Sequence, residues 1–254
     1  MRILLSLSPT KKFVYDLKYY YKTQGFIYSL LKNSEFSILH DKKSYKFFCF
    51  SNIFPIRDFK EKDERYILIS SPNENLIKVL TEKLKEIMEK EIYIHIGEME
   101  FKISHIKILK LKLNSKNCRL ISATPIIIRI PEKNYEKYNI PKEYRKRRFV
   151  YWRPQYSFEA FVKQLEENLI KKYEEFYKKS IEIDRIFEMF RFLKGPIVSH
   201  VIINGKEQKF IGSIWEFWFS YLNEKQKKML EFGIDAGFGE RNSLGFGFIN
   251  IINR

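Results

Sequence analysis

The stretch AGFGERNSLGFGFI, from Ala236 to Ile249, repeats the triplet Gly-Phe-Gly on either side of a short polar segment. Five of the chain's ten glycines lie between Gly233 and Gly247. Glycine has no Cβ to hold a ligand away from the backbone, and it readily adopts positive φ angles. A loop of this kind can direct successive N–H groups at one anion. Arg241, at its centre, adds a planar, permanently charged guanidinium suited to phosphate. The stretch therefore predicts an anion-binding loop.

The whole chain is basic, with 47 lysines and arginines against 31 aspartates and glutamates and a formal net charge of +16. A strongly positive chain attracts nucleic acid, so the predicted anion is a nucleic-acid phosphate. A composition rich in lysine and isoleucine also arises from genome bias or from adaptation to heat. Charge alone favours a nucleic-acid partner and leaves this compositional origin open.

The composition also restricts the class of protein. The chain has 254 residues, of which 44% are hydrophobic, enough for a packed core in one large domain or two smaller ones. Cys49 and Cys118 provide no disulfide framework, and the four histidines lack metal-site spacing, so we expect no metal and no cofactor. The start, MRILLSLSP, is too short an apolar run for a signal peptide, and no run approaches the roughly 20 apolar residues of a membrane span. We therefore expect a cytoplasmic protein without a membrane partner.

The first half of the chain shows the alternation of strands and helices that is typical of a ferredoxin-like unit. Ser71-Pro72-Asn73-Glu74 matches a capping box, and Leu76, Leu80 and Leu84 follow on one helical face. The order of the elements is βαββαβ. The expected strands are 1–8, 45–54, 66–69, 91–96 and 101–111, and the expected helices are 19–32 and the one opened by the capping box.

The second half shows a looser version of the same order. Ser157 is expected to cap a long helix whose apolar face carries Phe161, Leu165 and Leu169. The segment 131–153 is a charged connector. The expected strands are 120–130, 181–192, 197–203, 210–221 and 246–252, and a shorter helix spans 223–232. The sequence therefore predicts an α+β protein of two tandem ferredoxin-like (βαββαβ) domains, 1–115 and 116–254.

Three residues in the first domain have side chains suited to cutting RNA. They are Tyr28 in QGFIYSLL, and His40 and Lys46 in ILHDKKSYKFFCFS. Cleavage without a metal needs a base for the 2′-OH proton, an acid for the leaving 5′-oxygen and a cation for the phosphate. Histidine titrates near neutrality, and lysine supplies the cation. Tyrosine can relay a proton if a neighbouring cation lowers its pKa. Singly, each residue has an ordinary explanation. Tyr28 could be a core residue with a solvated hydroxyl, His40 a structural histidine before a strand, and Lys46 a solvated surface charge.

The motifs QGxIY, LHDxKxYKFFxFS and GFGERNSLGFG, in this order along the chain, resemble those of a known family. This is the Cas6 family of the RAMP superfamily, the CRISPR-associated endoribonucleases that cut repeat-containing precursor RNA into guide RNAs. The resemblance implies two ferredoxin-like domains and the catalytic positions Tyr28, His40 and Lys46. It implies metal-independent transesterification that leaves a 2′,3′-cyclic phosphate and a 5′-OH.

The resemblance places Tyr28 at the 2′-OH, makes Lys46 the group that stabilises the transition state, and leaves His40 as acid or base. Asp41 directly follows His40 and favours the protonated imidazolium, so we assign His40 as the general acid. The implied partner is CRISPR repeat RNA, with possible transfer of the product to an effector complex. Family members include monomers and homodimers.

Further basic residues are candidates for RNA binding. KEYRKRRFVYWR, from Lys142 to Arg153, interleaves cations with aromatic rings that can contact phosphates and stack on unpaired bases. A solvated connector between domains would have a similar composition. The predicted RNA-binding residues are Lys42, Arg147, Arg148, Gly237, Gly239, Arg241, Asn242, Ser243, Gly245 and Gly247.

Two other functions remain as alternatives. A non-catalytic RNA-binding RAMP subunit could hold a guide RNA inside a larger complex, and it would bind RNA without producing fragments. A general basic RNA-binding protein would explain the charge, but it would not explain why the glycine loop and the His40 segment occur together. Cleavage of repeat RNA distinguishes the nuclease from both.

Overall fold

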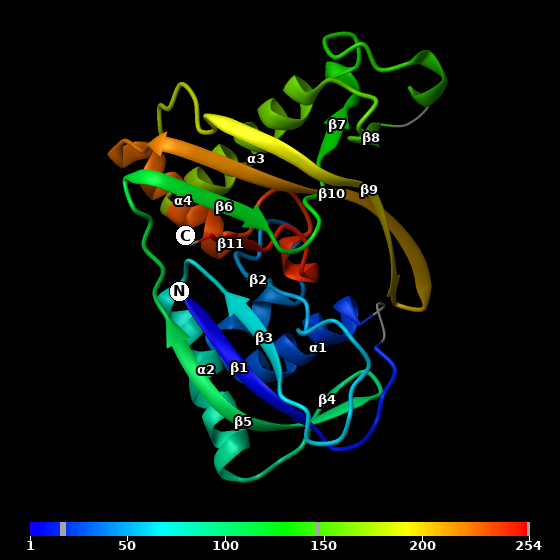
Figure 1. The fold of residues 1–254 in the computed structure, drawn as a ribbon, viewed down its shortest axis with the longest axis vertical. Helices are drawn as coiled ribbons and strands as arrows, with labels where there is room; N and C mark the ends of the chain where they lie inside the picture. The colour runs from blue at the N-terminus through cyan, green and yellow to red at the C-terminus, as the bar shows by residue number, and fades with distance from the viewer. Residues whose placement is uncertain (16–18, 146–147, 253–254) are drawn as a thin grey trace.

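The fold was obtained as a computed structural model that describes residues 1–15, 19–145 and 148–252 (Figure 1). The described residues form two antiparallel sheets, one in each half of the chain, and a two-stranded insertion. The α-helices are α1 (Tyr20–Leu31), α2 (Glu74–Glu89), α3 (Phe158–Tyr177) and α4 (Glu224–Ala236), and the 3-10 helices are η1 (Glu35–Leu39), η2 (Glu132–Asn134), η3 (Lys142–Tyr144) and η4 (Asn242–Leu244). The strands are β1 (Arg2–Pro9), β2 (Cys49–Phe50), β3 (Arg65–Ser70), β4 (Ile94–Ile96), β5 (Met99–Leu109), β6 (Lys116–Ser122), β7 (Arg129–Pro131), β8 (Phe149–Tyr151), β9 (Met189–Ile203), β10 (Lys206–Tyr221) and β11 (Ile249–Ile251).

The first sheet has the order β2-β3-β1-β5-β4, and its neighbouring strands are antiparallel. Without β4, which is an added edge strand, this is the ferredoxin-like order. Ile3, Leu5 and Leu7 are fully buried on β1, as the period of two in a strand requires. Amphipathic helix α2 covers the sheet with a buried face that includes Leu76, Leu80 and Leu84.

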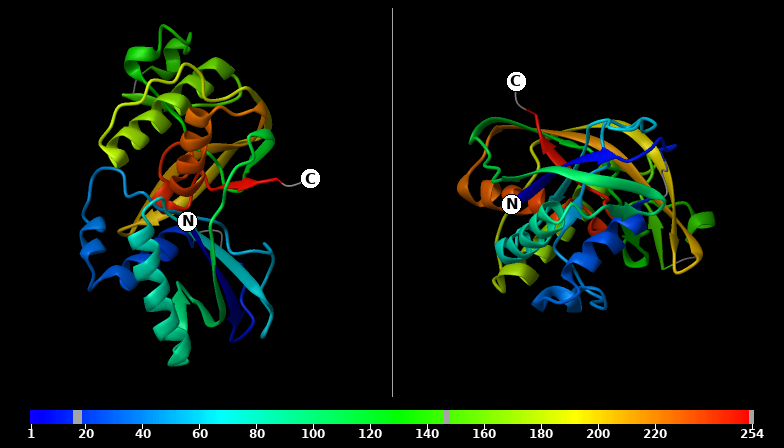
Figure 2. Two further views of the ribbon diagram at one scale, coloured as in Figure 1. Left: turned by 90° about the vertical axis from the view of Figure 1, so that its left-hand side faces the viewer. Right: turned by 90° about the horizontal axis from the view of Figure 1, so that it is seen from below.

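The second sheet repeats this order with β11-β6-β10-β9. The strands β7 and β8 form a separate pair that is inserted between β6 and α3. Both views in Figure 2 show α1, α2 and α3 on one side of the molecule and the two sheets on the other. The predicted pair of tandem ferredoxin-like units is therefore confirmed, with β7 and β8 as an addition that the sequence did not reveal.

Two of the expected strands form one strand in the structure, and the first of them begins later than expected. Segments 181–192 and 197–203 were expected as separate strands, but β9 runs unbroken from Met189 to Ile203 through Gly195 and Pro196. Pro196 is tolerated because β9 is an edge strand whose register with β10 shifts at this point. Lys194 pairs with Ile214 and Ile197 with Gly212, so the missing N–H of Pro196 interrupts no paired position. Residues 181–188 lie outside any strand, because the Glu166 carboxylate accepts the backbone N–H groups of Ile186 and Phe187.

Two further expectations need correction. The strand expected over 120–130 ends at Ser122, and Thr124 Oγ1 then accepts the N–H of Phe248 at 2.8 Å. The cap of α2 is Asn73, whose Oδ1 accepts the N–H of Leu76 at 3.1 Å. The hydroxyl of Ser71, which the sequence pattern predicts as the cap, instead donates a hydrogen bond to Phe47 O at 2.6 Å. Ser71 therefore contacts the segment before β2 and does not cap the helix.

The start of β1 joins the two halves of the chain. Arg2 is 2% exposed, and its guanidinium donates to Ile234 O at 3.1 Å, to Ile249 O and to Asn250 Oδ1 at 3.0 Å. Its Cζ lies 4.4 Å from the centre of the Phe248 ring. Burial of this cation is compensated by acceptors from the second half, so Arg2 fixes one unit against the other. In the described part of the chain, no helix combines the length and the apolar character needed to cross a membrane.

Candidate active site

Tyr28, His40 and Lys46 lie together in the structure, although they come from different elements. Tyr28 lies on α1, His40 directly follows η1, and Lys46 precedes β2. Lys46 Nζ donates to Tyr28 OH at 2.6 Å and to the backbone carbonyl of His40 at 2.9 Å. The Tyr28 and His40 rings meet edge to face, with centres 5.3 Å apart. One cation thus ties the phenol to the segment that carries the imidazole.

The imidazole of His40 is open to solvent, with 66% of the side chain exposed. Its Nδ1 lies 2.6 Å from Asp41 Oδ1, and that contact orients the ring. When the carboxylate accepts the Nδ1 proton, the Nε2 atom is left to exchange a proton with a substrate. An accessible nitrogen held at one angle is the arrangement that proton transfer to a bound RNA requires.

Burial determines the ionisation state of Tyr28. Desolvation raises the pKa of its phenol well above the usual range, and this outweighs the hydrogen bond with the Ser243 side chain, which lowers it. The condition for a tyrosine relay, a pKa lowered by a neighbouring cation, is therefore not met. The phenol of Tyr28 is therefore protonated at neutral pH, where it is a neutral hydrogen-bonding group.

Partial burial lowers the pKa of Lys46, with a smaller opposing effect from Asp41. The cation is therefore lost at a pH below the ordinary lysine value of about 10.4. If Lys46 must be charged for cleavage, the cleavage rate should decline on the alkaline side at a pH below the ordinary lysine pKa. Lys46→Arg should move this decline to higher pH, because arginine stays protonated throughout the range. Single-turnover rates between pH 6 and 11 test this, and a decline at the same pH in the two proteins would contradict it.

The glycine-rich loop is a packed structural element. The N–H groups of Gly237, Gly245 and Gly247 donate to the carbonyls of Gly233, Asn242 and Pro125 at 2.8–2.9 Å. These three amides are therefore engaged within the chain, and the expectation that they point at an anion is wrong. An added Cβ would lie 2.5 Å from Ile127 O at Gly239 and 2.5 Å from the Phe50 ring at Gly245. The glycines permit close packing of the loop.

Lys172, on α3, holds this loop from inside the protein. Its side chain is 1% exposed, and Nζ donates to Gly237 O, to Gly239 O at 3.1 Å and to Asn242 Oδ1 at 3.0 Å. Burial lowers the pKa of Lys172 to about 7. Only the ammonium form can donate to all three acceptors. Sequence reasoning missed this residue, although a lysine three residues after Leu169 on an apolar face was a signal.

The loop also contacts the helix that carries Tyr28. Gln24 Nε2, on α1, donates to Ser243 O at 2.8 Å and to Ser243 Oγ at 3.1 Å. Tyr28 lies one turn further along the same helix and contacts the Ser243 side chain. The C-terminal half of the chain therefore helps to position a candidate catalytic residue of the N-terminal half.

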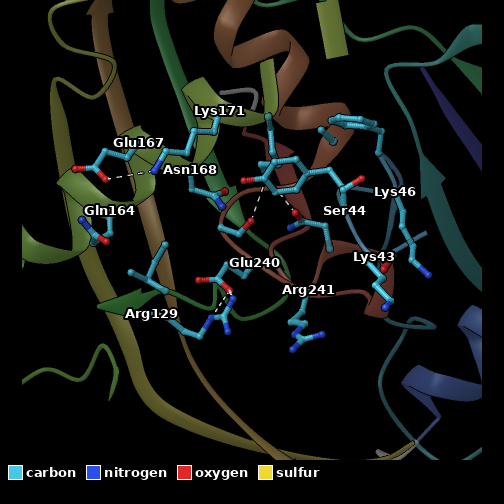
Figure 3. A pocket seen from close by; sticks show the side chains of 18 of the residues that line it. Lys43, Ser44, Lys46, Arg129, Gln164, Glu167, Asn168, Lys171, Glu240 and Arg241 are labelled. Carbon is cyan, nitrogen blue, oxygen red and sulfur yellow. Dashed lines mark hydrogen bonds and ion pairs between the residues drawn. The ribbon is translucent and has the colours of Figure 1, made fainter. Parts of the chain in front are cut away.

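A cavity of about 910 Å³ opens beside Lys46, between the His40 segment, α3 and the glycine loop (Figure 3). Eight cations line it against two carboxylates, Glu167 and Glu240. The carboxylates are paired, Glu240 with Arg129 and Glu167 with Lys171 at 3.8 Å. The cations are Lys42, Lys43, Lys46, Arg129, Arg148, Lys171, Lys172 and Arg241. This excess of positive charge suits a polyanion.

The cavity brings together several of the predicted RNA-binding residues. Lys42, Arg148, Gly239, Arg241, Asn242 and Ser243 line it, whereas Arg147 lies outside the described residues. Arg129 and Lys171 were not predicted, because neither lies in one of the motifs or basic segments quoted above. Arg129 places its guanidinium 4.6 Å from the centre of the Phe149 ring.

Solved structures show the class of fold. A protein described as "An RAMP protein binding different RNA substrates" has a TM-score of 0.73 at 24% identity and covers 100% of both chains. Another, "CRISPR associated protein Cas6", has a TM-score of 0.71 at 25% identity, over 100% of this chain and 99% of that one. The fold is thus the RAMP type.

Residues 110–251 match the family model described as CRISPR associated protein Cas6, C-terminal. The chain is 34% identical to CRISPR-associated endoribonuclease Cas6 2 of Methanocaldococcus jannaschii, over 99% of this chain and 100% of that one. It is 28% identical to the CRISPR-associated endoribonuclease Cas6 of Haloferax mediterranei, over 100% and 94%. The chain therefore belongs to the Cas6 family of CRISPR-associated endoribonucleases.

Proposed function

We propose that this chain cuts CRISPR repeat precursor RNA into guide RNAs by metal-independent transesterification. The 2′-oxygen attacks the adjacent phosphorus, the bond from phosphorus to the 5′-oxygen breaks, and the products carry a 2′,3′-cyclic phosphate and a 5′-OH. The observation that carries the proposal is the bridge from Lys46 Nζ to Tyr28 OH and His40 O, at the edge of a cavity rich in cations.

Each of the three side chains has a distinct task in this proposal. Lys46 stabilises the charge that develops on the phosphate, as a preorganised cation does in a partly desolvated site. His40 donates its proton to the leaving 5′-oxygen. Tyr28, kept neutral by burial, donates a hydrogen bond that orients the nucleotide, and the 2′-OH proton passes to water.

The test uses purified protein and an end-labelled RNA of one CRISPR repeat from the same genome, incubated in EDTA. We expect one discrete cut. The upstream fragment should carry a phosphate at its 3′ end that phosphatase cannot remove until the cyclic phosphate is opened with acid. Binding of the RNA should weaken with salt, with a log–log slope of roughly −0.7 for each phosphate contact to a single strand. Tight binding without a cut would contradict the proposal and favour a subunit that holds guide RNA.

A further inference from the structure

Two amide side chains on α3 line the cavity (Figure 3), and each has one buried polar atom without a hydrogen-bond partner in the described part of the chain. Gln164 and Asn168 are four residues apart, so they lie on the same face of the helix. Gln164 Nε2 and Asn168 Oδ1 are buried, and neither has a hydrogen-bond partner among the residues that the structure describes. Gln164 is only 8% exposed. Native proteins pair nearly all such groups, so an unpaired donor and an unpaired acceptor on two residues that line one cavity point to a ligand.

The chemistry of this wall selects the kind of ligand. Asn168 Oδ1 is an acceptor, so its partner must be an N–H or O–H donor. A phosphodiester has no such proton, so the phosphate backbone cannot satisfy this atom. The edge of a nucleobase carries an acceptor and an N–H donor side by side, and these complement the two amides.

The other walls supply what a nucleotide needs around its base. Phe149 is partly exposed, and the Arg129 guanidinium that lies over its ring adds a planar cation on which a base can stack. Arg148 and Arg241 are exposed and can take the phosphates on either side of the base. The two amides, the pair of Phe149 and Arg129, and the exposed arginines thus line the same cavity.

We propose that Gln164 and Asn168 form a base-recognition subsite that reads one unpaired nucleotide of the bound RNA. Gln164 Nε2 donates to an acceptor on the base edge, and Asn168 Oδ1 accepts from an N–H group of the same base. The inference rests on the proposed function, because it takes the repeat RNA as the ligand. In this proposal, residues of α3 select the RNA sequence, and the different residues Tyr28, His40 and Lys46 act at the phosphate that is cut.

The test combines protein variants with RNA lacking single bases. Gln164→Met keeps the length of the side chain, and Asn168→Leu keeps its branching, while both remove the polar atoms. Wild-type protein should lose about tenfold in affinity when one particular nucleotide of the repeat is made abasic. The double variant should bind intact RNA about tenfold more weakly than the wild type. Its affinity should be the same for intact RNA and for RNA that is abasic at that position.

Controls separate this subsite from general effects. Gln208→Leu, at an exposed glutamine on β10, should match the wild type at every abasic position. Because the buried amide atoms have no partner, Gln164→Met should melt at or above the wild-type temperature, and it serves alone if the double variant is unstable. Equal sensitivity of wild type and variant to every abasic position would overturn the subsite. Failure of wild-type protein to bind or cut repeat RNA would instead overturn the proposed function.

Discussion

Replacing His40 with alanine should slow cleavage of repeat RNA by about 10² to 10⁴, the usual contribution of a general acid. Affinity for the RNA should change little, because 66% of the His40 side chain is exposed and its contacts are with Asp41 and with the Tyr28 ring. Folding should be intact for the same reason. Single-turnover cleavage with excess protein measures the chemical step, and titration of a 2′-deoxy analogue at the cut site measures affinity without cleavage.

The matched control is His95→Ala. His95 is exposed to a similar degree, 61%, and its Nε2 lies 2.9 Å from Glu100 Oε2, so it reproduces the histidine–carboxylate pair away from the cavity. It should cut at the wild-type rate. Wild-type cutting by His40→Ala would show that the proton comes from another group. An equal loss in both variants would indicate a general effect of removing an exposed imidazole.

Gly247→Ala should destabilise the fold by roughly 4 kcal/mol or more, the range reserved for severe steric or buried-polar defects. The residue has a φ of +71°, and an added Cβ would overlap the carbonyl oxygen of Phe238. That oxygen already accepts from Asn242 Nδ2 at 3.0 Å, so it cannot move without breaking the loop. Chemical denaturation, monitored by tryptophan fluorescence, measures the loss in the free energy of unfolding.

Gly205→Ala separates backbone strain from collision. Gly205 lies between β9 and β10 with a φ of +73°, and its added Cβ would meet nothing within 4 Å. This variant carries only the conformational penalty, about 1–2 kcal/mol. A similar loss in both variants would show that packing around Gly247 contributes little.

Local patterns in the sequence were sufficient for most of the elements. The helical spacing of Leu76, Leu80 and Leu84 and the Ser157 cap correspond to α2 and α3 in the structure. Such patterns depend on neighbours along the chain, so they are readable without tertiary knowledge. The continuous β9 was not readable, because the tolerance of Pro196 depends on which strand lies at the edge of the sheet.

The candidate site was predictable in part for the same reason. Tyr28, His40 and Lys46 stand in quotable motifs, and the structure brings them together. The role of Lys172 depends on three acceptors about 65 to 70 residues away, which no local pattern contains. The glycines were noticed, but the close approach of Ile127 and Phe50 to them arises only in the folded chain.

The hydrogen bonds between Gln24 and Ser243 have a consequence for the timing of synthesis. A nascent chain that has emerged through Lys46 already carries the three candidate catalytic side chains. It lacks Ser243, which the ribosome adds 197 residues after Lys46. We therefore expect a polypeptide that has not yet reached Ser243 to be inert toward RNA, so that messenger and ribosomal RNA near the exit tunnel are not exposed to a prematurely assembled nuclease.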